Sequence, residues 1–512
     1  MQGRAEPRPA PATSGALLAL VPLRVEARAV GRGASGLRVE RTGAGPARAA
    51  AAAARMASLP GKAMVVAGVA GALVNDLHPG DLVVADRVVD DHGQLVTDLP
   101  SATLLASALR RAGLQARTGT IASTDSLVRG RPARDALAAL GAAAVDMESA
   151  AILRHPWERP VAVVRAIADT PGRDLISLST VSGGIAALRA LRAAAPVLVA
   201  WAAATEPRRV LMAGPRSFCA GVSRAIETVE RAIGRYGAPV YVRRQIVHNS
   251  HVVTELEGRG AVFVQELEEV PDGATVVFSA HGVAPSVRAD AAARRITVVD
   301  ATCPLVAKVH TEIRRFNERG YEVVLVGHAG HDEVEGSMGE APAMHLVSTP
   351  EQVDALETVD GARVAYVTQT TLSPDETSSV VEALRRRYPT LIGPHAGDIC
   401  YATHNRQDAV RAVAADTDLV LVVGSSNSSN AARLVEAARS AGAAAELVDD
   451  PEALDLAWLT GVGNIGLTAA ASTPESVVAR VVDALRGLGP VKVSERTVHT
   501  ENVYFSLPPE VR

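Results

Sequence analysis

The sequence predicts an α/β fold for both halves of the chain, because short runs of apolar, β-branched residues alternate with alanine-rich helical stretches. Runs of this kind occupy residues 63–68 and 161–167, and a further series opens at residues 210–213. Short β-branched runs separated by helical stretches are typical of parallel sheets that helices cover. In such sheets the side chains that carry function gather at the carboxyl ends of the strands.

Size and composition restrict the class of protein. A chain of 512 residues is too long for one hydrophobic core. Its formal net charge is −4, it has no long basic block, and aromatic residues make up only 3%, which argues against nucleic acid as a partner. The three cysteines are widely spaced and odd in number, so they do not suit a disulfide framework and indicate a reducing cytoplasm.

The amino-terminal residues 1–15 are rich in alanine, proline and arginine and lack an apolar stretch before a cleavage site. We expect a disordered leader there. The longest apolar stretch, 193–204, is shorter than the roughly 20 residues that span a bilayer. Just before it, Arg189 and Arg192 alternate with leucines, as on an amphipathic helix packed against a core. We therefore predict no transmembrane segment and a cytoplasmic location, while a visit to a membrane surface stays open.

A seam near residues 205–209 divides the chain, so we expect one domain over residues 16–204 and a second over residues 209–512. Candidate strands of the second domain are residues 275–279, 322–327, 364–368, 418–424 and 464–468. Polar motifs follow the first four of these runs directly, at residues 280–282, 327–331, 368–371 and 424–430. These positions predict a functional site at the carboxyl ends of parallel strands.

All three cysteines, Cys219, Cys303 and Cys400, fall in the second domain, each in a short motif rich in glycine, proline or aspartate. Thiolate sulfur suits iron–sulfur clusters and zinc. Three thiolates that meet at one point can bind three irons of a cubane cluster and leave the fourth iron open to substrate. A structural zinc site usually draws on closely paired cysteines, and the chain has no Cys-x-x-Cys pair. Three unrelated buried thiols remain the alternative.

Three histidines beside glycine or asparagine, His248, His281 and His331, stand where strands are expected to end. A compact polyanion such as a diphosphate needs many hydrogen bonds, and imidazolium supplies positive charge near pH 7. We therefore predict a diphosphate pocket; its further donors are Ser428, Ser429, Asn430 and Ser472. The chain lacks the Gly-x-x-x-x-Gly-Lys-Ser/Thr loop, which disfavours a nucleoside triphosphate.

Glu333, two residues past His331, is the candidate proton donor. A carboxyl held near a diphosphate and a low-dielectric cluster should have a raised pKa and stay partly protonated. Thr370 would pass that proton on or anchor a substrate hydroxyl. The alternative is that Glu333 is an ordinary solvated charge on a loop.

The motifs of the second domain resemble those of the 4-hydroxy-3-methylbut-2-enyl diphosphate reductases, in order from about residue 209 to residue 512. The matching segments are Phe218-Cys-Ala-Gly-Val222, Val247-His-Asn249, Ser279-Ala-His-Gly-Val283, Asp300-Ala-Thr-Cys-Pro-Leu-Val306, Gly327-His-Ala-Gly-His331, Val334-Glu-Gly336, Thr368-Gln-Thr-Thr-Leu-Ser373, Asp398-Ile-Cys-Tyr-Ala402 and Asn427-Ser-Ser-Asn430.

This resemblance implies three similar α/β subdomains around a central iron–sulfur cluster, and a reductive dehydroxylation that yields isopentenyl and dimethylallyl diphosphates. It implies that Cys219, Cys303 and Cys400 hold a [4Fe–4S] cluster and that a ferredoxin or flavodoxin supplies electrons. By the same resemblance the diphosphate is held by His248, His281, Ser428, Ser429, Asn430 and Ser472. His331 contacts the substrate, and Glu333 and Thr370 form the proton path.

Two positions depart from the pattern of the reductases. Asp332 stands where proline is common, and His404 follows the third cysteine motif where a small hydroxyl residue is common. Neither change removes a cysteine, so we expect activity with an altered rate or pH profile.

The first domain carries its own candidate site. Glycine-rich segments at 42–47, 68–73 and 80–84 adjoin expected strands or helices and can cradle anions or sugars. Val145-Asp-Met-Glu-Ser149 and Ala166-Ile-Ala-Asp-Thr170 resemble segments of the purine nucleoside phosphorylase and methylthioadenosine nucleosidase superfamily. The resemblance implies that Met147 and Glu148 hold ribose, that Asp169 assists departure of the base, and that Glu26 activates the attacking water.

The choice between hydrolysis and phosphorolysis stays open, as does a partner domain retained only for folding. Dimerisation through the first domain would fit this superfamily. One hypothesis for the fusion is a shared isoprenoid context, with adenosylhopane or methylthioadenosine as the nucleoside. Two alternatives for the whole chain remain: a zinc-binding phosphate site, or a catalytic nucleoside domain joined to an interaction scaffold.

Overall fold

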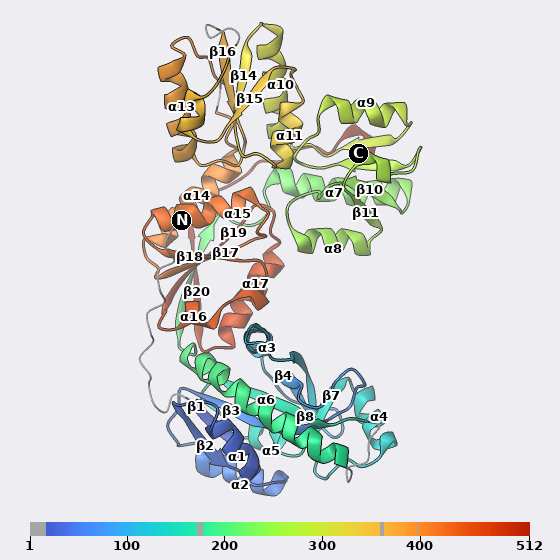
Figure 1. Cartoon of the computed structure of the whole chain (residues 1–512), viewed down its shortest axis with the longest axis vertical. Coiled ribbons are helices and arrows are strands. Elements are labelled where there is room, and N and C mark those ends of the chain that lie inside the picture. The colour runs from blue at the N-terminus through green and yellow to red at the C-terminus, as the bar shows by residue number, and fades with distance from the viewer. Residues whose placement is uncertain (1–16, 172–177, 359–362, 396) are drawn as a thin grey trace. The chain divides into compact units, whose positions relative to one another are not determined.

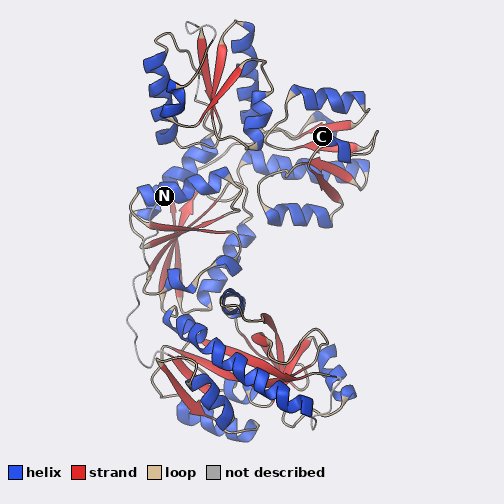
Figure 2. Ribbon diagram, in the orientation of Figure 1, coloured by secondary structure: helices blue, strands red, loops and turns tan. Residues whose placement is uncertain are grey.

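A computed structural model describes residues 17–171, 178–358, 363–395 and 397–512. The expected leader over residues 1–15 lies outside the described residues. The chain divides into two compact units. The first comprises Met1–Arg209, Asp450–Gly463 and Ala479–Lys492, and the second comprises Val210–Asp449, Asn464–Val478 and Val493–Arg512. Helices surround strands in each unit (Figure 2), which confirms the predicted α/β class.

The first unit contains an eight-stranded mixed sheet with the order β2-β1-β3-β7-β6-β4-β5, in which β8 pairs with β3 and β4. Its strands are β1 (Leu17–Val21), β2 (Leu37–Arg41), β3 (Ala63–Ala72), β4 (Leu82–Asp90), β5 (Leu95–Asp98), β6 (Ala116–Ser123), β7 (Ala142–Asp146) and β8 (Val161–Asp169). Its helices are α1 (Arg24–Gly31), α2 (Pro46–Met56), α3 (Ala102–Arg111), α4 (Arg131–Ala139), α5 (Ser149–Leu153) and α6 (Leu178–Ala203), with η2 (Pro451–Ala453) and α16 (Leu456–Leu459) from a later segment.

Helix α6 extends beyond the apolar stretch that we considered too short to span a membrane. By length and composition alone, residues Val181–Ala203 could cross a bilayer. The helix crosses the sheet in Figure 1 and packs against β8 and α1. Leu191, Leu198 and Trp201 are fully buried, whereas Arg189 and Arg192 are exposed. This one-sided burial is that of an amphipathic helix on a core, as predicted.

The second unit contains three parallel-stranded subdomains. The first subdomain has the strand order β11-β10-β12-β13, made of β10 (Val240–Arg243), β11 (Ala261–Val264), β12 (Thr275–Phe278) and β13 (Thr297–Asp300). The second has the order β15-β14-β16, made of β14 (Glu322–Val326), β15 (Met344–Val347) and β16 (Val364–Thr368). The third has the order β18-β17-β19-β9-β20, made of β9 (Arg208–Gly214), β17 (Leu419–Val423), β18 (Ala444–Val448), β19 (Asn464–Ala469) and β20 (Val491–Thr497).

Helices cover the strands of each subdomain and contribute to separate hydrophobic cores. They are α7 (Ala220–Tyr236), α8 (Ser250–Gly258), α9 (Pro285–Ala293), α10 (Pro304–Glu318), α11 (Asp332–Met338), α12 (Pro350–Asp354), α13 (Pro374–Arg387), α14 (Tyr401–Ala414) and α15 (Ser429–Ser440), with the short η1 (Leu267–Glu269) and η3 (Pro509–Val511). Helix α17 (Glu475–Arg486) begins in the second unit, and its residues from Ala479 on belong to the first. Three subdomains are what the sequence resemblance implied, and the five strands predicted for this half are confirmed.

One prediction for the first unit was wrong. Residues 68–73 were expected to form a glycine-rich turn after a strand, but β3 continues to Ala72. Gly68 and Gly71 lie inside this strand. A Cβ on Gly68 would lie 2.4 Å from Arg165 Nη1, and one on Gly71 would lie 3.1 Å from Asp169 Oδ1. These glycines therefore make room for charged side chains and do not form a turn.

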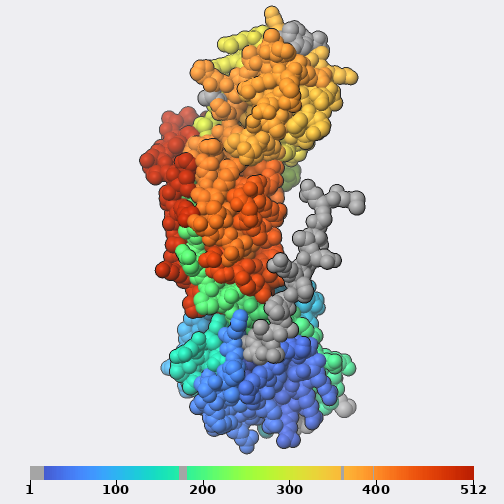
Figure 3. Space-filling model, turned by 90° about the vertical axis from the view of Figure 1, so that its left-hand side faces the viewer, coloured from blue at the N-terminus to red at the C-terminus, as the bar shows by residue number. Residues whose placement is uncertain are grey.

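The carboxy-terminal segment, residues 498–512, follows β20 and joins two subdomains of the second unit. Its Glu501 carboxylate accepts hydrogen bonds from Arg406 Nη1 at 2.9 Å and Asn405 Nδ2 at 3.1 Å, both on α14. Further on, Val511 is buried in the core of the first subdomain. The end of the chain (red) forms part of the surface in Figure 3, and Tyr504 is 77% exposed.

Candidate functional site

A cavity in the second unit lies where the carboxyl ends of strands from all three subdomains meet. Its lining residues from the first and second subdomains include His248, His281, Cys303, His331, Glu333, Thr370 and Thr371. Those from the third subdomain and the segments next to it include Cys219, Cys400, Ser428, Ser429, Asn430, Ser472 and Phe505. The structure therefore brings together every residue that the sequence predicted for this site. Their convergence follows largely from the parallel sheets, since most lining loops leave a strand at its carboxyl end; Cys400 instead lies between α13 and α14.

Each cysteine is the N-cap residue of a helix: Cys219 of α7, Cys303 of α10 and Cys400 of α14. Each also stands where the chain passes from one subdomain to the next. Helix α7 follows β9 of the third subdomain and packs on β10 of the first, and α10 follows β13 of the first and packs on β14 of the second. Helix α14 then packs on β19 of the third subdomain. Each cysteine therefore lies at a point where the chain crosses from one subdomain to another.

The thiols lie close together and are poorly solvated. A Cβ on Gly221 would lie 2.7 Å from Cys303 Sγ and 3.8 Å from Cys219 Sγ. Burial raises the pKa of Cys303 to about 12 and that of Cys400 to about 11, and the neighbouring Cys219 adds to both shifts. Thr403 opposes the shift at Cys400, because its hydroxyl lies 3.0 Å from the Cys400 sulfur. Three sulfurs in this environment favour a shared cation over three free thiolates.

Three imidazoles form another wall of the cavity. The rings of His248 and His281 stack with centroids 4.1 Å apart, and the ring of His331 stands edge-on to both, at 5.2 Å and 5.7 Å. Hydrogen bonds hold the ring of His331 and the backbone of His248. His331 Nδ1 accepts from the backbone N–H of Glu333 at 3.1 Å, and Ser472 Oγ donates to the backbone carbonyl of His248 at 3.1 Å.

Without a bound ligand, the pKa values of these imidazoles lie below their ordinary range. Burial lowers the pKa of His331 to about 4, and the charge of His248 adds to this effect. Burial and the two neighbouring imidazoles also lower the pKa of His281, and burial lowers that of His248. The main cause is burial, which disfavours the charged form, and repulsion between neighbouring imidazolium charges adds to it at His281 and His331. A bound anion would instead attract these positive charges, so it would favour protonation of the imidazoles.

Several polar atoms around the cavity have no hydrogen-bond partner among the residues that the structure describes. They are Asn430 Nδ2, Asn430 Oδ1 and His248 Nε2. Ser428 Oγ caps α15 by accepting from Ala431 N at 3.3 Å, and Asn430 lies in the first turn of the same helix. Buried polar atoms are normally satisfied, so unpaired ones beside a helix N-terminus indicate a polar, anionic ligand.

Glu333 is buried, with only 2% of its surface exposed. Its Oε1 accepts a hydrogen bond from Thr370 N at 2.7 Å, and its Oε2 accepts one from Thr370 Oγ1 at 2.9 Å. Burial raises the pKa of Glu333, although the hydrogen bonds from Thr370 oppose the shift. The raised pKa confirms the sequence expectation and excludes the alternative of a solvated loop charge.

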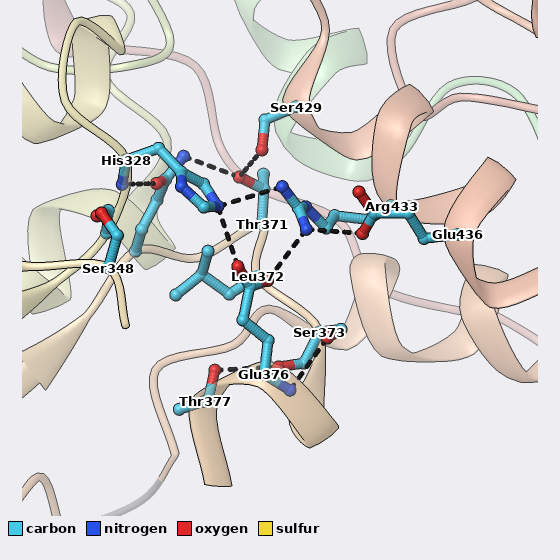
Figure 4. A network of polar contacts seen from close by, with 12 residues as sticks. His328, Ser348, Thr371, Leu372, Ser373, Glu376, Thr377, Ser429, Arg433 and Glu436 are labelled. Atoms are coloured by element: carbon cyan, nitrogen blue, oxygen red, sulfur yellow. Dashed lines mark hydrogen bonds and ion pairs between the residues drawn. The ribbon is translucent and has the colours of Figure 1, made fainter. Parts of the chain in front are cut away.

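A polar network joins the second and third subdomains beside the cavity (Figure 4). Arg433 on α15 lies 3.0 Å from His328 Nε2 and 3.1 Å from Glu376 Oε2 of the second subdomain. Nearby, Thr371 Oγ1 donates to Ser429 Oγ at 3.1 Å. The two hydroxyls line the cavity, so this network fixes the relative position of two of its walls.

The two departures from the pattern of the reductases lie in different places. Asp332 is the first residue of α11 and lies 3.9 Å from His281 Nδ1, next to the imidazoles. His404 is half exposed on α14 and lies 3.4 Å from Asp408, and it does not line the cavity. Asp332 is therefore the departure that bears on the site.

A second cavity lies within the first unit and includes Glu26, Met147, Glu148 and Asp169 in its lining. Glu26 is buried and accepts hydrogen bonds from Val69 N at 2.8 Å and Leu23 N at 2.7 Å. Burial raises its pKa, although the bond from Val69 and the charge of Arg165 oppose the shift. Glu148 Oε1 accepts from Gly45 N at 2.9 Å, at the glycine-rich turn that precedes α2.

Three residues at or near these sites were not predicted from the sequence. Arg134 forms an ion pair with Asp169, His310 is buried against Gly282, and Phe505 lines the cysteine cavity. Arg134 stands in an alanine-rich helix and Phe505 near the end of the chain. Only tertiary contacts bring them to the sites, so no local motif marks them.

Comparison with known proteins agrees with this architecture. Residues 210–486 match the family model described as LytB protein, and residues 33–180 match the Phosphorylase superfamily. The 4-hydroxy-3-methylbut-2-enyl diphosphate reductase of Acidothermus cellulolyticus is 57% identical over 307 residues, which are 60% of this chain and 90% of that protein. Reductase 1 of Mycobacterium tuberculosis is 56% identical over 308 residues, covering 59% of this chain and 94% of that protein.

Among solved structures, the E-1-hydroxy-2-methyl-but-2-enyl-4-diphosphate reductase of Plasmodium falciparum is 38% identical, with a TM-score of 0.57. The match covers 60% of this chain and 97% of that one. Fold, site and relatives together define an oxidoreductase of isoprenoid biosynthesis. The chain belongs to the LytB protein family, the 4-hydroxy-3-methylbut-2-enyl diphosphate reductases, and carries in addition an amino-terminal domain like those of the phosphorylase superfamily.

Proposed function

We propose that residues 209–512 reduce (E)-4-hydroxy-3-methylbut-2-enyl diphosphate to isopentenyl and dimethylallyl diphosphates. The observation that carries this proposal is one cavity that combines three half-buried thiols, unpaired polar donors and a buried acid. The thiols suit a redox metal, the donors suit a diphosphate, and the acid suits loss of a hydroxyl as water.

Cys219, Cys303 and Cys400 would hold a [4Fe–4S] cluster. The donor set fits such a group, because three soft sulfurs lie at three helix N-termini, where the helix dipoles favour negative charge. Gly221 adds to the fit, since any side chain there would collide with the Cys303 sulfur. When bound, the cluster supplies a Lewis-acidic iron for the hydroxyl oxygen and a route for electrons.

His248, His281, Ser428, Ser429, Asn430 and Ser472 would hold the diphosphate, with His331 against the rest of the substrate. The imidazoles are neutral before the ligand arrives, and the diphosphate charge favours their protonation. Binding should therefore take up protons and strengthen as pH falls. Desolvation of the buried donors by the ligand strengthens each hydrogen bond.

Glu333 would donate the proton that turns the leaving hydroxyl into water. Its burial keeps the acid form populated toward neutral pH. Thr370 donates hydrogen bonds to both of its carboxylate oxygens, which holds the carboxyl in one orientation, and both residues line the cavity. A ferredoxin or flavodoxin would supply the electrons from a cytoplasmic pool.

The test is anaerobic reduction of the hydroxylated diphosphate by the purified full chain with a chemical one-electron reductant. We expect a brown protein with iron and sulfide bound, and formation of both products. A colourless protein that contains zinc and forms no product would favour the zinc alternative instead. Replacement of Glu333 by glutamine should abolish turnover while the diphosphate still binds.

We also propose that the first domain cleaves a purine nucleoside, on the support of its match to the phosphorylase superfamily and of its cavity. Met147 and Glu148 would hold the ribose, Asp169 would assist departure of the base, and Glu26 would activate the attacking water. Asp169 forms an ion pair with Arg134. The base must therefore displace Arg134 before the Asp169 carboxylate can assist its departure.

Release of adenine from adenosylhopane and from methylthioadenosine tests this second proposal, with and without phosphate to separate phosphorolysis from hydrolysis. The full chain and its Asp169→Asn variant are compared. If the unmodified chain releases adenine and the Asp169→Asn variant does not, the result supports cleavage at this cavity. No release from either, with correct folding, would leave the domain a structural partner, for example in a homodimer.

A further inference from the structure

Gln245, in the segment between β10 and α8, contacts residues on two sides of the proposed diphosphate pocket and has no part in the function described so far. Its side-chain oxygen Oε1 accepts a hydrogen bond from Asn427 Nδ2 at 2.9 Å. The same oxygen lies 3.4 Å from His248 Nδ1. Gln245 and His248 belong to the first subdomain and Asn427 to the third, so one amide group joins two walls of the pocket.

The backbone on both sides of this contact is held by other bonds. Ser472 Oγ donates to the backbone carbonyl of His248 at 3.1 Å, and α8 begins two residues after His248. Asn427 directly precedes Ser428, which is the N-cap residue of α15. Because these backbones are fixed, the Gln245 amide acts mainly on the His248 ring.

The two contacts of Gln245 Oε1 decide which nitrogen of the His248 ring carries a hydrogen. The Asn427 amide N–H donates to Oε1, which is a carbonyl oxygen and can only accept. A hydrogen bond between Oε1 and His248 Nδ1 therefore requires the hydrogen to be on Nδ1. In the neutral ring the other nitrogen, Nε2, then has a lone pair and no hydrogen.

His248 Nε2 is buried and has no hydrogen-bond partner among the residues that the structure describes. The His281 ring stacks on His248 from the turn after β12, and His331 stands edge-on to it from the start of α11. The Asp332 carboxylate of α11 also acts on the His248 ring, and Arg244 of its own loop pairs with that carboxylate. Within the described chain, Nε2 is thus the atom of this ring that remains available to a ligand.

The hydrogen on Nδ1 determines how His248 can bind an anion. A diphosphate oxygen accepts hydrogen bonds, so it cannot bond to a nitrogen that offers only a lone pair. His248 must first take up a proton at Nε2, and the resulting imidazolium forms a strong, charge-assisted hydrogen bond. The opposite neutral form, with its hydrogen on Nε2, would bond to the diphosphate without taking up a proton, and more weakly.

We propose that Gln245 is a positioning residue that keeps the hydrogen of neutral His248 on Nδ1, so that diphosphate binding adds a proton at Nε2. The inference rests on the proposed diphosphate pocket. The hydrogen bond from Asn427 holds the Gln245 amide with its oxygen toward the ring, and solvent supplies the proton. Gln245 itself does not touch the diphosphate and acts only through His248.

The experiment is titration calorimetry of the full chain with inorganic diphosphate, in buffers of different ionisation enthalpy, which counts the protons taken up on binding. Gln245→Met keeps the length of the side chain but removes the acceptor, so His248 can carry its hydrogen on Nε2. We expect uptake near neutral pH to fall by about 0.5–1 proton per diphosphate and the affinity to fall about 5- to 20-fold. Gln265→Met is the matched control, because Gln265 is exposed in the same subdomain and does not line the cavity.

Gln245→Glu is the conservative variant, because a carboxylate oxygen can accept from both Asn427 and His248. Its negative charge also favours the imidazolium form of His248. Proton uptake should therefore persist in this variant and move to higher pH by about 0.5–1 unit. A pocket that had merely been loosened would not shift in this direction.

Equal proton uptake by the unmodified chain and Gln245→Met would overturn the inference, as would the same loss of uptake in Gln245→Met and Gln245→Glu. If Gln245→Met does not fold, the direction of the shift in Gln245→Glu decides. An unmodified chain that binds no diphosphate would reject the pocket itself and this role with it. A chain that binds diphosphate with the expected uptake but forms no product would reject the reductase proposal and support the role of Gln245.

Discussion

Arg244 Nη1 lies 2.5 Å from Asp332 Oδ1, and the second oxygen of that carboxylate lies 3.9 Å from His281 Nδ1. Arg244 also pairs with Glu266 at 3.0 Å and Glu335 at 2.6 Å, on a left-handed backbone with a φ of 56°. The Asp332 carboxylate thus lies beside the imidazoles of the proposed diphosphate pocket, and its ion pair with Arg244 holds it in place. The charge state of the pocket depends on this pair.

We expect Asp332→Asn to move the pH dependence of diphosphate binding to lower pH. Burial lowers the pKa of His248 and of His331, and the Asp332 charge opposes both shifts. Without that charge, protonation of the imidazoles requires a lower pH, by about 0.5–1 unit. Titration calorimetry with inorganic diphosphate across pH measures the shift. Glu335→Gln is the control, because it also contacts Arg244 but is not among the charges that act on the imidazoles; an equal shift there would contradict the assignment.

Gly221→Ala should reduce the iron content of the purified protein. Its new methyl group would lie 2.7 Å from the Cys303 sulfur, and overpacking of this kind costs about 1–3 kcal/mol. Gly234→Ala is the matched control, since it lies on the same helix with nothing within 4 Å. The control should keep its iron and gain about 0.5–1 kcal/mol of stability from lower backbone freedom. Iron and sulfide assays distinguish the two, and unchanged content in Gly221→Ala would refute the close packing of the thiols.

Glu333→Gln should lower kcat by about 100-fold or more, with the diphosphate still bound. On the proposed role, turnover needs the acid form of Glu333, and this form is lost as pH rises through its raised pKa. The kcat of the chain should therefore fall on the alkaline side of that pKa. A pH profile of kcat checks this, and a profile without an alkaline limb would assign the proton to another group.

The same carboxyl should make stability depend on pH. Its pKa in the folded protein lies above the ordinary value of 4.5, so the folded state binds the proton more tightly than the unfolded state. The free energy of unfolding should then decrease as pH rises from about 4.5 through the raised pKa. Glu333→Gln removes this part of the decrease, which denaturant titrations at several pH values can measure. Parallel curves for the two proteins would show that Glu333 does not titrate in this window.

Arg433→Gln should loosen the network between the second and third subdomains. The variant loses the contacts with His328 and Glu376, and hydrogen bonds of charged groups contribute about 1.5–3 kcal/mol each. Because Thr371 and Ser429 line the cavity beside this network, we expect a higher KM for the diphosphate substrate and a smaller change in kcat. Glu436→Gln, which removes only the more exposed partner of Arg433, is the control. Equal KM values for the unmodified chain and Arg433→Gln would show that this network does not affect substrate binding.

Local sequence patterns predicted much of the fold and the site. Strands such as β14 and β17 are continuous apolar runs because helices cover both faces of their sheets. The site residues follow these strands directly, so their convergence could be expected from parallel topology alone. The cysteines could be assigned to one site because each lies in a motif suited to a turn or helix start.

What failed depended on contacts between distant residues. The glycines of β3 suggested a turn, but the space they leave is filled by Arg165 and Asp169 from another strand. The lowered pKa values of the imidazoles could not be predicted, because both their burial and their mutual distances are tertiary. The pairing of His310 with Glu340 joins α10 to the turn after α11, and the role of Arg134 depends on an ion pair across the first unit. None of these leaves a signal within a short window of sequence.

The position of each cysteine at a crossing between subdomains has a consequence for stability. A metal group bound by Cys219, Cys303 and Cys400 would tie three chain crossings together, so its loss would free all three at once. The free energy of unfolding should therefore depend on the metal content of the protein.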